Sequence, residues 1–274
     1  YCSAQNYIWD GLIDEVRVYN RVLSSDEIKR LYKMGSTFVI NKPRTDTLKD
    51  GLVGYWSFDG PDMSQSTNNT WALDRSGQGN NGKLKNMATS TARVIGKIGQ
   101  GLDFDGSNDY IQITDNASLQ MAGNYTLSAW VKLNTLSGRQ DIIAKWDAGA
   151  TNNYAYLLSW NVSNTRFSTW TATGASCGGT PFFEADSTST INTGVWYHVV
   201  GVYNGAALNL YLNGVREGVT AVTAVNQACA RELNIGGNPI ESSSQYFNGL
   251  IDELRVYNRA LTADEIKRLY QMGR

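Results

Sequence analysis

The chain carries almost no net charge. Its 274 residues include 24 Lys and Arg against 25 Asp and Glu, a formal charge of −1. A protein held on nucleic acid by counterion release needs a basic surface, and no lysine- or arginine-rich stripe interrupts this balance. We therefore do not expect nucleic-acid binding.

Long apolar runs are also missing. No stretch reaches the roughly 18 residues that a membrane-spanning helix needs, and the first residues lack the charged, then apolar, then small pattern of a secretion signal. We therefore expect no membrane insertion and see no targeting segment. Because the sequence begins at Tyr1 rather than at methionine, we interpret it as a processed chain or an excerpt.

Cysteine and histidine are scarce. The three cysteines are Cys2, Cys177 and Cys229, and none has the paired spacing of a structural zinc site. Cys177 and Cys229 are the candidate disulfide because both lie in one expected domain; three reduced thiols are the alternative, since spacing alone cannot place two Cα atoms within bridging distance. The single histidine, His198, has no serine-elbow motif beside it, so we expect a structural imidazole.

Apolar and aromatic residues, by contrast, are plentiful. The chain is 42% hydrophobic, with 27 Gly, 15 Tyr and 8 Trp but only 4 Pro. This composition suffices for a sizeable core and excludes a disordered tail. At this length one large β domain and two smaller domains are both plausible.

An internal repeat decides the organisation. The segment GLIDEVRVYNRVLSSDEIKRLYKMG (11–35) recurs as GLIDELRVYNRALTADEIKRLYQMG (249–273), with 20 of 25 positions identical. Each copy predicts a strand followed by a short helix: in the second, Thr262 and Glu265 form a capping box and Gly273 follows the last turn. Ser24, Glu27 and Gly35 repeat these signals in the first.

Between the two copies the sequence is a series of short β patterns rich in aromatic and branched residues, with no alternating helices. Such a series predicts an antiparallel sandwich rather than a parallel α/β sheet. The strands expected are LVGYWSF (52–58), DYIQIT (109–114), YTLSAWVKL (125–133), DIIAKW (141–146), YAYLLSW (154–160), RFSTWT, VWYHVVGVY, ALNLYLNG and ELNIGG.

The repeat predicts three parts. Residues 1–36 are the last strand and helix of a preceding repeat, 37–50 a linker, and 51–274 one complete domain. An isolated strand and helix cannot bury its own apolar face. We therefore expect it to find a partner surface, on the complete domain or on a neighbouring copy by strand addition; its apolar residues are Ile8, Trp9, Leu12, Ile13, Val16 and Val18.

The motifs resemble the laminin G-like modules of the concanavalin A-like lectin and glucanase superfamily, and are most similar to tandem modules of bacterial surface proteins. The resemblance rests on GLVGYWSFDG, LDRSGQGNNGKL, GLDFDGSNDYIQI, TLSAWVK, WYHVVGVYNG, LYLNG and FNGLIDELRVYNRALTADEI. It implies an all-β fold, a concanavalin A-like antiparallel jelly-roll sandwich with a short C-terminal helix.

The loop from Asp74 to Gly82 has two interpretations. It can be a plain glycine-rich turn, or it can supply oxygen ligands to a structural Ca²⁺. Similar modules imply that this loop and Asp252 meet around one calcium, with Asp74, Asn80 and Gly82 as further ligands. Asp59 is a reserve candidate. We expect no metal at Asp14, the counterpart of Asp252 in the first copy.

The carboxylate motif expected of a glycoside hydrolase is incomplete in this sequence. Glucanases of this superfamily carry Glu-x-Asp-x-x-Glu on one strand, and the nearest match is Glu184-Ala-Asp186, without the second glutamate and in what the sequence suggests is a Ser/Thr-rich loop. The adjacent Asp252 and Glu253 face opposite sides of a strand. We predict that the chain is not an enzyme, a glycoside hydrolase being the less favoured alternative.

Aromatic side chains are the remaining chemical resource, because sugars stack their apolar faces on rings. In YAYLLSW we expect Tyr154, Tyr156, Leu158 and Trp160 to share one face. Burial in the sandwich core is the alternative for each ring, and we assign Trp130 and Trp196 to the core. The candidate ligand-binding residues are Trp146, Tyr154, Tyr156, Trp160 and Trp170.

The sequence thus predicts an extracellular or cell-surface recognition and adhesion module, calcium-stabilised, that binds a glycan or a surface protein. The alternative is a structural repeat of a fibre or stalk that assembles into filaments with neighbouring copies through residues 1–36. The sequence does not identify the ligand.

Overall fold

The computed structural model describes residues 16–36, 47–66, 69–87, 92–146, 154–174, 177, 180–224, 226, 228–239 and 245–274. The chain divides into two compact units, Tyr1–Thr45 and Asp46–Arg274. Thr47 and Asp50, which the sequence assigns to a linker, belong to the larger unit because their backbone carbonyls accept hydrogen bonds from Arg259.

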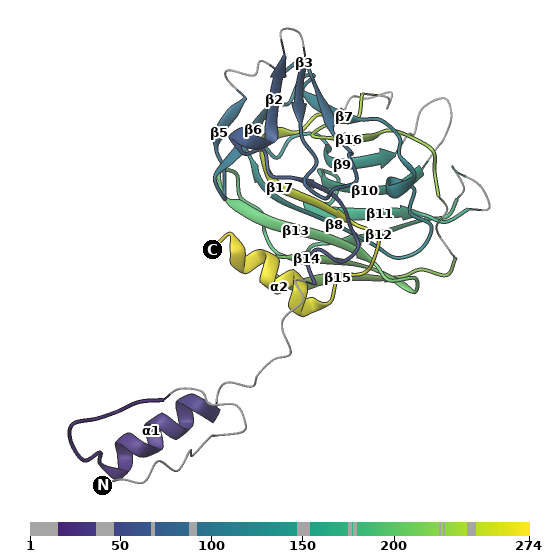
Figure 1. The fold of residues 1–274 in the computed structure, drawn as a ribbon. Coiled ribbons are helices and arrows are strands. Elements are labelled where there is room, and N and C mark those ends of the chain that lie inside the picture. The colour runs from purple at the N-terminus through teal and green to yellow at the C-terminus, as the bar shows by residue number, and fades with distance from the viewer. Residues whose placement is uncertain are drawn as a thin grey trace. The chain divides into compact units, whose positions relative to one another are not determined.

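The larger unit consists of two antiparallel sheets (Figure 1). In spatial order the first sheet contains β15 (Val215–Ala221), β14 (Ala207–Leu212), β13 (Trp196–Tyr203), β8 (Tyr125–Leu133), β17 (Asn248–Tyr257), β6 (Gln100–Asp105) and β5 (Arg93–Ile95), and β1 (Leu52–Trp56) also pairs with β17. The second contains β12 (Phe182–Asp186), β11 (Arg166–Ala172), β10 (Tyr154–Asn161), β9 (Gln140–Trp146), β16 (Leu233–Ile235), β7 (Tyr110–Ile113), β4 (Gly82–Lys85), β3 (Asn69–Ala72) and β2 (Met63–Ser66). The predicted concanavalin A-like sandwich is confirmed.

The core lies between the inner faces of the two sheets. Its large side chains, among them Trp56, Phe104, Tyr125, Trp160 and Leu254, are fully buried. Alternate residues of each strand point inward, so the β-rich patterns in the sequence supply this layer directly. Burial of so much apolar surface is the main force that holds the sheets together.

The outer face of the first sheet is covered by helix α2 (Ala263–Met272). Ile266 and Leu269 pack on a cluster that contains Val200, Val202 and Tyr257. The predicted capping box is present, because Thr262 Oγ1 accepts from Glu265 N while the Glu265 carboxylate accepts from Thr262 N. Two further turns, η1 (Gly60–Asp62) and η2 (Ala117–Leu119), are 3₁₀ helices.

Two tryptophans differ from the prediction that both lie in the core. Trp130 is buried, but beneath α2, where it stacks on Tyr270 with ring centroids 5.6 Å apart. Trp196 is half-buried, and Lys132 Nζ lies 5.5 Å from the centroid of its ring. Both residues alternate with inward-facing neighbours on β8 and β13, which places them on the outer face.

In the smaller unit the structure describes residues 16–36, which contain helix α1 (Ser25–Ser36). Residues 11–15 of the predicted first-copy strand lie outside the described residues, and Val16–Tyr19 have no strand assignment, because no neighbouring strand pairs with them within the described part of this unit. Among the described residues no helix is long and apolar enough to cross a membrane.

Candidate functional site

Four aromatic side chains gather on the outer face of the second sheet, and we call them the aromatic patch: Trp146 of β9, Tyr154 of β10, Trp170 of β11 and Phe182 of β12. The ring centroids of Trp146 lie 4.8 Å from Tyr154, 5.2 Å from Phe182 and 6.2 Å from Trp170. Tyr154 and Phe182 meet edge to face at 4.6 Å. The rings therefore form one continuous apolar cluster across four neighbouring strands, in which Trp146 is 5% exposed and Phe182 is 36% exposed.

A β-bulge places Tyr154 in this patch. Tyr154 pairs with Trp146, but Tyr156 pairs with Lys145, so the register shifts between them. Because a bulge inserts one extra residue, it moves the preceding side chains to the opposite face. The expectation that Tyr154, Tyr156, Leu158 and Trp160 share one face is therefore wrong for Tyr154.

Tyr156 and Trp160 are core residues rather than ligand-binding residues. Both are fully buried. The Tyr156 hydroxyl donates to the carbonyl of Leu119 at 3.0 Å, and Trp160 Nε1 donates to the carbonyl of Leu136 at 3.2 Å. Because their polar atoms are hydrogen-bonded inside the protein, Tyr156 and Trp160 are no longer candidates for ligand binding. The other three candidates, Trp146, Tyr154 and Trp170, lie together.

Polar side chains accompany the patch on the same face. Asn234 pairs with Ala144, two residues before Trp146, and Ser159 lies two residues beyond Leu157, which packs with Trp146. Asn238 Nδ2 donates to the carbonyl of Trp146 at 2.8 Å. Ser159 lies on β10, Asn234 lies on β16 and Asn238 follows β16, so only the sheet order brings them to the rings.

Four of the polar atoms near the rings have no hydrogen-bond partner among the described residues. They are Ser159 Oγ, Asn234 Oδ1, Asn238 Oδ1 and Trp170 Nε1. Ser159, Asn234 and Asn238 are at least 98% buried. A buried polar atom without a partner costs about 1–3 kcal/mol, so these atoms mark a part of the face whose polar groups the described residues leave unsatisfied.

Glu184 and Asp186 extend the face at its edge. They lie on strand β12, not in a loop as the sequence suggested, and pair with Trp170 and Ser168 of β11. Asn161 Nδ2 donates to Glu184 at 2.9 Å, and the Ser168 hydroxyl donates to Asp186. Burial raises the pKa of Glu184, and the nearby Asp186 carboxylate adds to this effect.

The Asp74 side chain does not fit a cation. Its Oδ1 accepts from the amides of Tyr55 and Ser76, and its Oδ2 accepts from the Ser76 hydroxyl and the Asn80 amide. A carboxylate offers about four lone-pair positions, so four donors occupy them all. The Asn80 carbonyl accepts from Trp56 Nε1, and Gly82 begins β4, where it pairs with Ala72 and Ile113.

Asp252 has its own separate set of donors. The amides of Lys97 and Ile98 donate to its Oδ2 and the amide of Glu253 to its Oδ1. Burial raises its pKa to about 7. Asp59 instead accepts from the amide of Gln100. Asp74 and Asp252 share no donor, and the described residues contain no group of three acidic, histidine or cysteine side chains placed to hold a metal. The calcium site stays a prediction, and this geometry does not favour it.

His198 and the cysteines have structural surroundings. His198 Nε2 lies 3.0 Å from Ser128 Oγ, and burial lowers the pKa of its imidazole to about 3. A neutral, enclosed imidazole suits the structural role expected for it. Cys177 and Cys229 form a disulfide with Cα atoms 5.2 Å apart, and Cys2 lies outside the described residues.

A cavity of about 710 Å³ lies beside α2 and is lined by cationic and apolar residues. Its arginines already have partners: Arg75 pairs with Asp62, Arg255 with Glu253, and Arg268 donates to Thr47 Oγ1. Because these arginines are already paired, the cavity is a weaker candidate for a ligand site than the aromatic patch.

A family model described as the concanavalin A-like lectin/glucanases superfamily matches residues 105–267. The chain belongs to this superfamily. The matched region of this laminin G-like module contains every residue of the aromatic patch and its unpartnered polar neighbours. No curated protein sequence matches the chain.

Solved structures resemble the module over most of its length. Domain 4 of AbnA, a GH43 extracellular arabinanase from Geobacillus stearothermophilus solved with arabinotriose, is 25% identical, with a TM-score of 0.59 and coverage of 80% of this chain and 98% of that one. The binding domain of Paraclostridial Mosquitocidal Protein 1 is 17% identical (TM-score 0.60, 82% and 53% coverage). The botulinum neurotoxin serotype D ligand-binding domain, solved with N-acetylneuraminic acid, is 15% identical (TM-score 0.55, 82% and 51% coverage). The chain spans about half of each toxin domain, and these two share its fold.

Proposed function

We propose that this laminin G-like module is a non-catalytic carbohydrate-binding module that acts outside the cell and holds a glycan on the aromatic patch. One observation carries the proposal: a continuous cluster of aromatic rings lies on one outer face of the sandwich, beside the Glu184 and Asp186 carboxylates. Rings stack on the apolar faces of sugars, while amide and hydroxyl groups bind sugar hydroxyls.

The comparison with the arabinanase domain supports a carbohydrate rather than a protein ligand. That domain was solved with arabinotriose, and the present chain covers 98% of it at 25% identity. An extracellular setting agrees with the Cys177–Cys229 bond, because disulfides persist mainly in oxidising compartments.

The carboxyl pair supports a binding rather than a catalytic role. Glycosidases place an acid and a nucleophile or base on either side of the scissile bond. Glu184 and Asp186 lack the second glutamate of the superfamily's catalytic motif, and each is held by a hydrogen bond from a β10 or β11 side chain. Sugar hydroxyls can donate to such carboxylates without any bond being broken.

The test is calorimetric titration with arabinotriose together with a glycan array. We expect saturable binding in the micromolar to millimolar range, lost in Trp170→Ala and kept in Trp196→Ala. Trp196 is the matched control because it is a half-buried tryptophan on the other sheet. The proposal would be contradicted if the array gave no hits, or if both variants lost the hits equally. Release of shorter sugars would contradict the non-catalytic role.

A further inference from the structure

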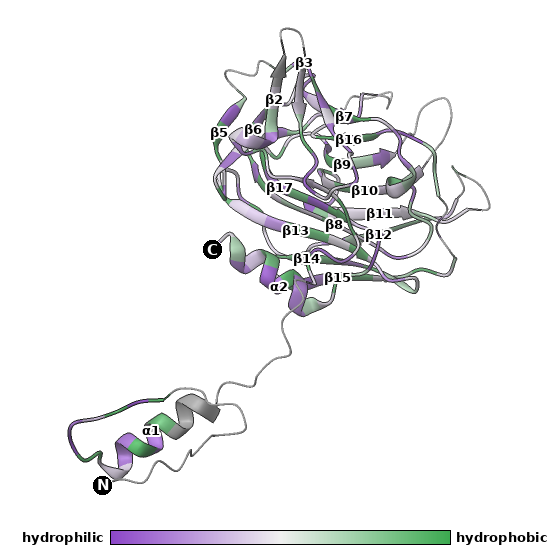
Figure 2. Cartoon of the chain, viewed as in Figure 1, coloured by the Kyte–Doolittle hydropathy of each residue, from purple (hydrophilic) through white to green (hydrophobic). Residues whose placement is uncertain are grey.

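The part of the aromatic patch that solvent reaches lies on β10, β11 and β12. Trp146 of β9 is 5% exposed, whereas Phe182 is 36% exposed and Tyr154 and Trp170 are half-buried. Strands β9, β10, β11 and β12 follow one another in the second sheet, and Figure 2 shows them in that order, coloured by hydropathy. A ligand on this face therefore reaches Tyr154, Trp170 and Phe182 more readily than Trp146.

Two half-buried carboxylates lie directly beside this accessible part. Glu184 is the cross-strand partner of Trp170, and Asp186 is the partner of Ser168. Directly paired residues have Cβ atoms about 4.5–5.5 Å apart. Glu184 and Asp186 are two residues apart on β12 and so share one face. A sugar that stacks on Trp170 therefore lies next to the Glu184 carboxylate.

The donors that hold the two carboxylates are uncharged. Among the described residues, Asn161 Nδ2 donates to Glu184 at 2.9 Å and the Ser168 hydroxyl donates to Asp186. Such donors orient a carboxylate but leave its negative charge uncompensated. Because an ionised carboxylate offers about four lone-pair positions, Glu184 and Asp186 can also accept hydrogen bonds from sugar hydroxyls.

Positive charge is scarce in this part of the chain. Between Lys145 and Arg216 the sequence contains one further Lys or Arg, which is Arg166. Arg166 begins β11, four residues or about 13 Å before Trp170, and its Nη1 donates to the carbonyl of Thr188. The position beside Trp170 therefore has a carboxylate as its cross-strand neighbour, and the cation of β11 lies at the other end of that strand.

Lys145 does not supply the missing charge, although it precedes Trp146 in β9. Its side chain is fully buried, and its Nζ lies 2.9 Å from Asp115 Oδ1 and also donates to the carbonyl of Arg231. Adjacent residues of a strand point to opposite faces, so Lys145 lies on the side of the sheet away from the rings. Asp115 balances its charge there.

A negative edge of this kind discriminates between ligands by their charge. An uncharged sugar residue gains hydrogen bonds when its hydroxyls donate to the carboxylates. A sugar that bears a carboxylate or a sulfate instead loses water and meets like charge. A repulsive element of this kind gives specificity just as an attractive contact does.

We propose that Glu184 and Asp186 restrict the aromatic patch to glycans without acidic groups. This inference rests on the proposed function, because it names the class of glycan that the patch holds. Glu184 is the main determinant, since it is the cross-strand neighbour of Trp170, and Asp186 adds a second negative charge two residues further along β12.

The test is calorimetric titration of the full chain with probes that differ in charge. Arabinotriitol is paired with arabinotrionic acid, and the methyl ester of trigalacturonic acid with the free acid. On a glycan array, each sialylated, sulfated or uronate-bearing glycan is compared with its unmodified parent. We expect the uncharged member of every pair that binds to bind at least tenfold more tightly at low ionic strength.

The two proposals fail in different ways. Acidic members that bind as tightly as their uncharged partners, or more tightly, overturn the charge selectivity and leave the carbohydrate-binding function intact. Binding of no glycan at all, in the titrations and on the array, overturns the proposed function and the selectivity with it.

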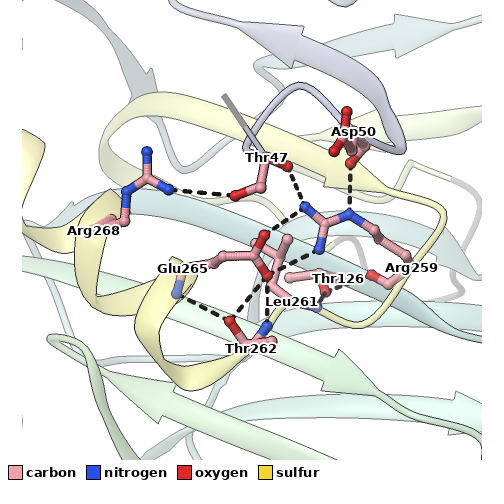
Figure 3. A network of polar contacts seen from close by, with 8 residues as sticks. All are labelled: Thr47, Asp50, Thr126, Arg259, Leu261, Thr262, Glu265 and Arg268. Atoms are coloured by element: carbon pink, nitrogen blue, oxygen red, sulfur yellow. Dashed lines mark hydrogen bonds and ion pairs between the residues drawn. The ribbon is translucent and has the colours of Figure 1, made fainter. Parts of the chain in front are cut away.

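A pair of double variants assigns the selectivity to the two carboxylates. In Glu184→Gln/Asp186→Asn we expect the preference to fall to threefold or less, because the acidic members bind more tightly than before. Asp50→Asn/Asp264→Asn is the matched control: it removes two exposed carboxylates before β1 and on α2, and it keeps the Asp50 carbonyl that accepts from Arg259 (Figure 3). The control should keep the tenfold preference. A preference that survives in the first variant, or falls equally in both, overturns the proposal.

Ionic strength gives a readout that needs no substitution. The screening length is about 30 Å at 0.01 M salt and about 3 Å at 1 M. The preference for the uncharged members should therefore shrink at least threefold between these two conditions, mainly because the acidic members bind more tightly at high salt. A preference that does not depend on salt reflects shape rather than charge and overturns the proposal.

Discussion

The ring centroid of Tyr154 lies 4.8 Å from that of Trp146, its cross-strand partner on β9, and a β-bulge follows Tyr154 on β10. The bulge puts Tyr154 on the outer face, whereas Tyr156 and Trp160 of the same strand face the core. A single inserted residue thus separates the outward-facing ring of β10 from the rings of β10 that lie in the core, and the two groups should respond differently to substitution.

Trp146 and Trp160 provide the first comparison. We expect Trp160→Ala to lower the free energy of unfolding by about 3–5 kcal/mol because it opens a cavity in the core, while the folded fraction keeps its affinity for glycan. Trp146→Ala should weaken glycan binding of the folded protein at least tenfold, and because Trp146 is only 5% exposed it should also lower the free energy of unfolding. Chemical denaturation and titration on the same preparations check both, and a Trp160→Ala protein that is stable but fails to bind would contradict this assignment.

Arg259 and Arg21 provide an internal control for the network in Figure 3. Arg259→Ala removes hydrogen bonds to Glu265 and to the carbonyls of Thr47 and Asp50. We expect the free energy of unfolding of the sandwich to fall by about 1–3 kcal/mol. Arg21→Ala should leave the melting of the sandwich unchanged in dilute solution; equal destabilisation by both changes would contradict this view.

Chelation tests the calcium prediction directly. A site filled at 100 times its Kd would add about 2.7 kcal/mol, or several degrees in Tm. Since four donors already occupy the Asp74 carboxylate, we expect EDTA and added CaCl₂ to leave Tm unchanged.

Asp74→Ala sharpens that test, because it should destabilise the protein by at least about 1.5 kcal/mol through lost hydrogen bonds. The loss should be the same with and without calcium. A loss seen only in calcium would restore Asp74 as a ligand.

His198 should make stability depend on pH. Burial lowers the pKa of its imidazole to about 3, against 6.5 for an exposed imidazole. Below about pH 6.5 the unfolded chain therefore binds a proton at His198 that the folded chain does not bind. The stability that depends on the neutral imidazole is fully present above about pH 6.5. It is lost as the pH falls toward 3, at up to about 1.4 kcal/mol per pH unit.

His198→Gln isolates this contribution. Titratable groups common to both proteins cancel in the difference between their free energies of unfolding. One of these groups is Asp252, whose raised pKa makes stability increase as the pH falls from about 7 to 4. We expect the variant to lose less stability than the unsubstituted protein between pH 6.5 and 4. Parallel curves would contradict a neutral buried imidazole.

Much of the fold could be predicted from local patterns. YTLSAWVKL coincides with β8, and the Thr262–Glu265 capping box was recognisable from its spacing. Both signals depend on residues close together in the chain. The strand expected at Val16–Tyr19 shows the limit, since the equivalent Leu254–Tyr257 is a strand where β8 and β1 pair with it.

The candidate site was only partly predictable. Residue type predicts Trp146, Tyr154 and Trp170, which lie together on the outer face, but it also predicts Tyr156 and Trp160, which lie in the core because a bulge interrupts the alternation. Phe182, Asn234 and Asn238 were missed. Alternation in FFEAD could have indicated Phe182, whereas nothing local to Asn234 or Asn238 relates them to Trp146.

The antiparallel sandwich, the strand and helix at 249–273, and the duplication of that segment can all be predicted from sequence. They depend on short-range periodicity, helix capping and the identity between two segments. Only the three-dimensional arrangement shows which rings face outward and which carboxylates already have donors. Those outcomes depend on strand register and sheet order, and hence on contacts between residues as far apart as Tyr55 and Glu253.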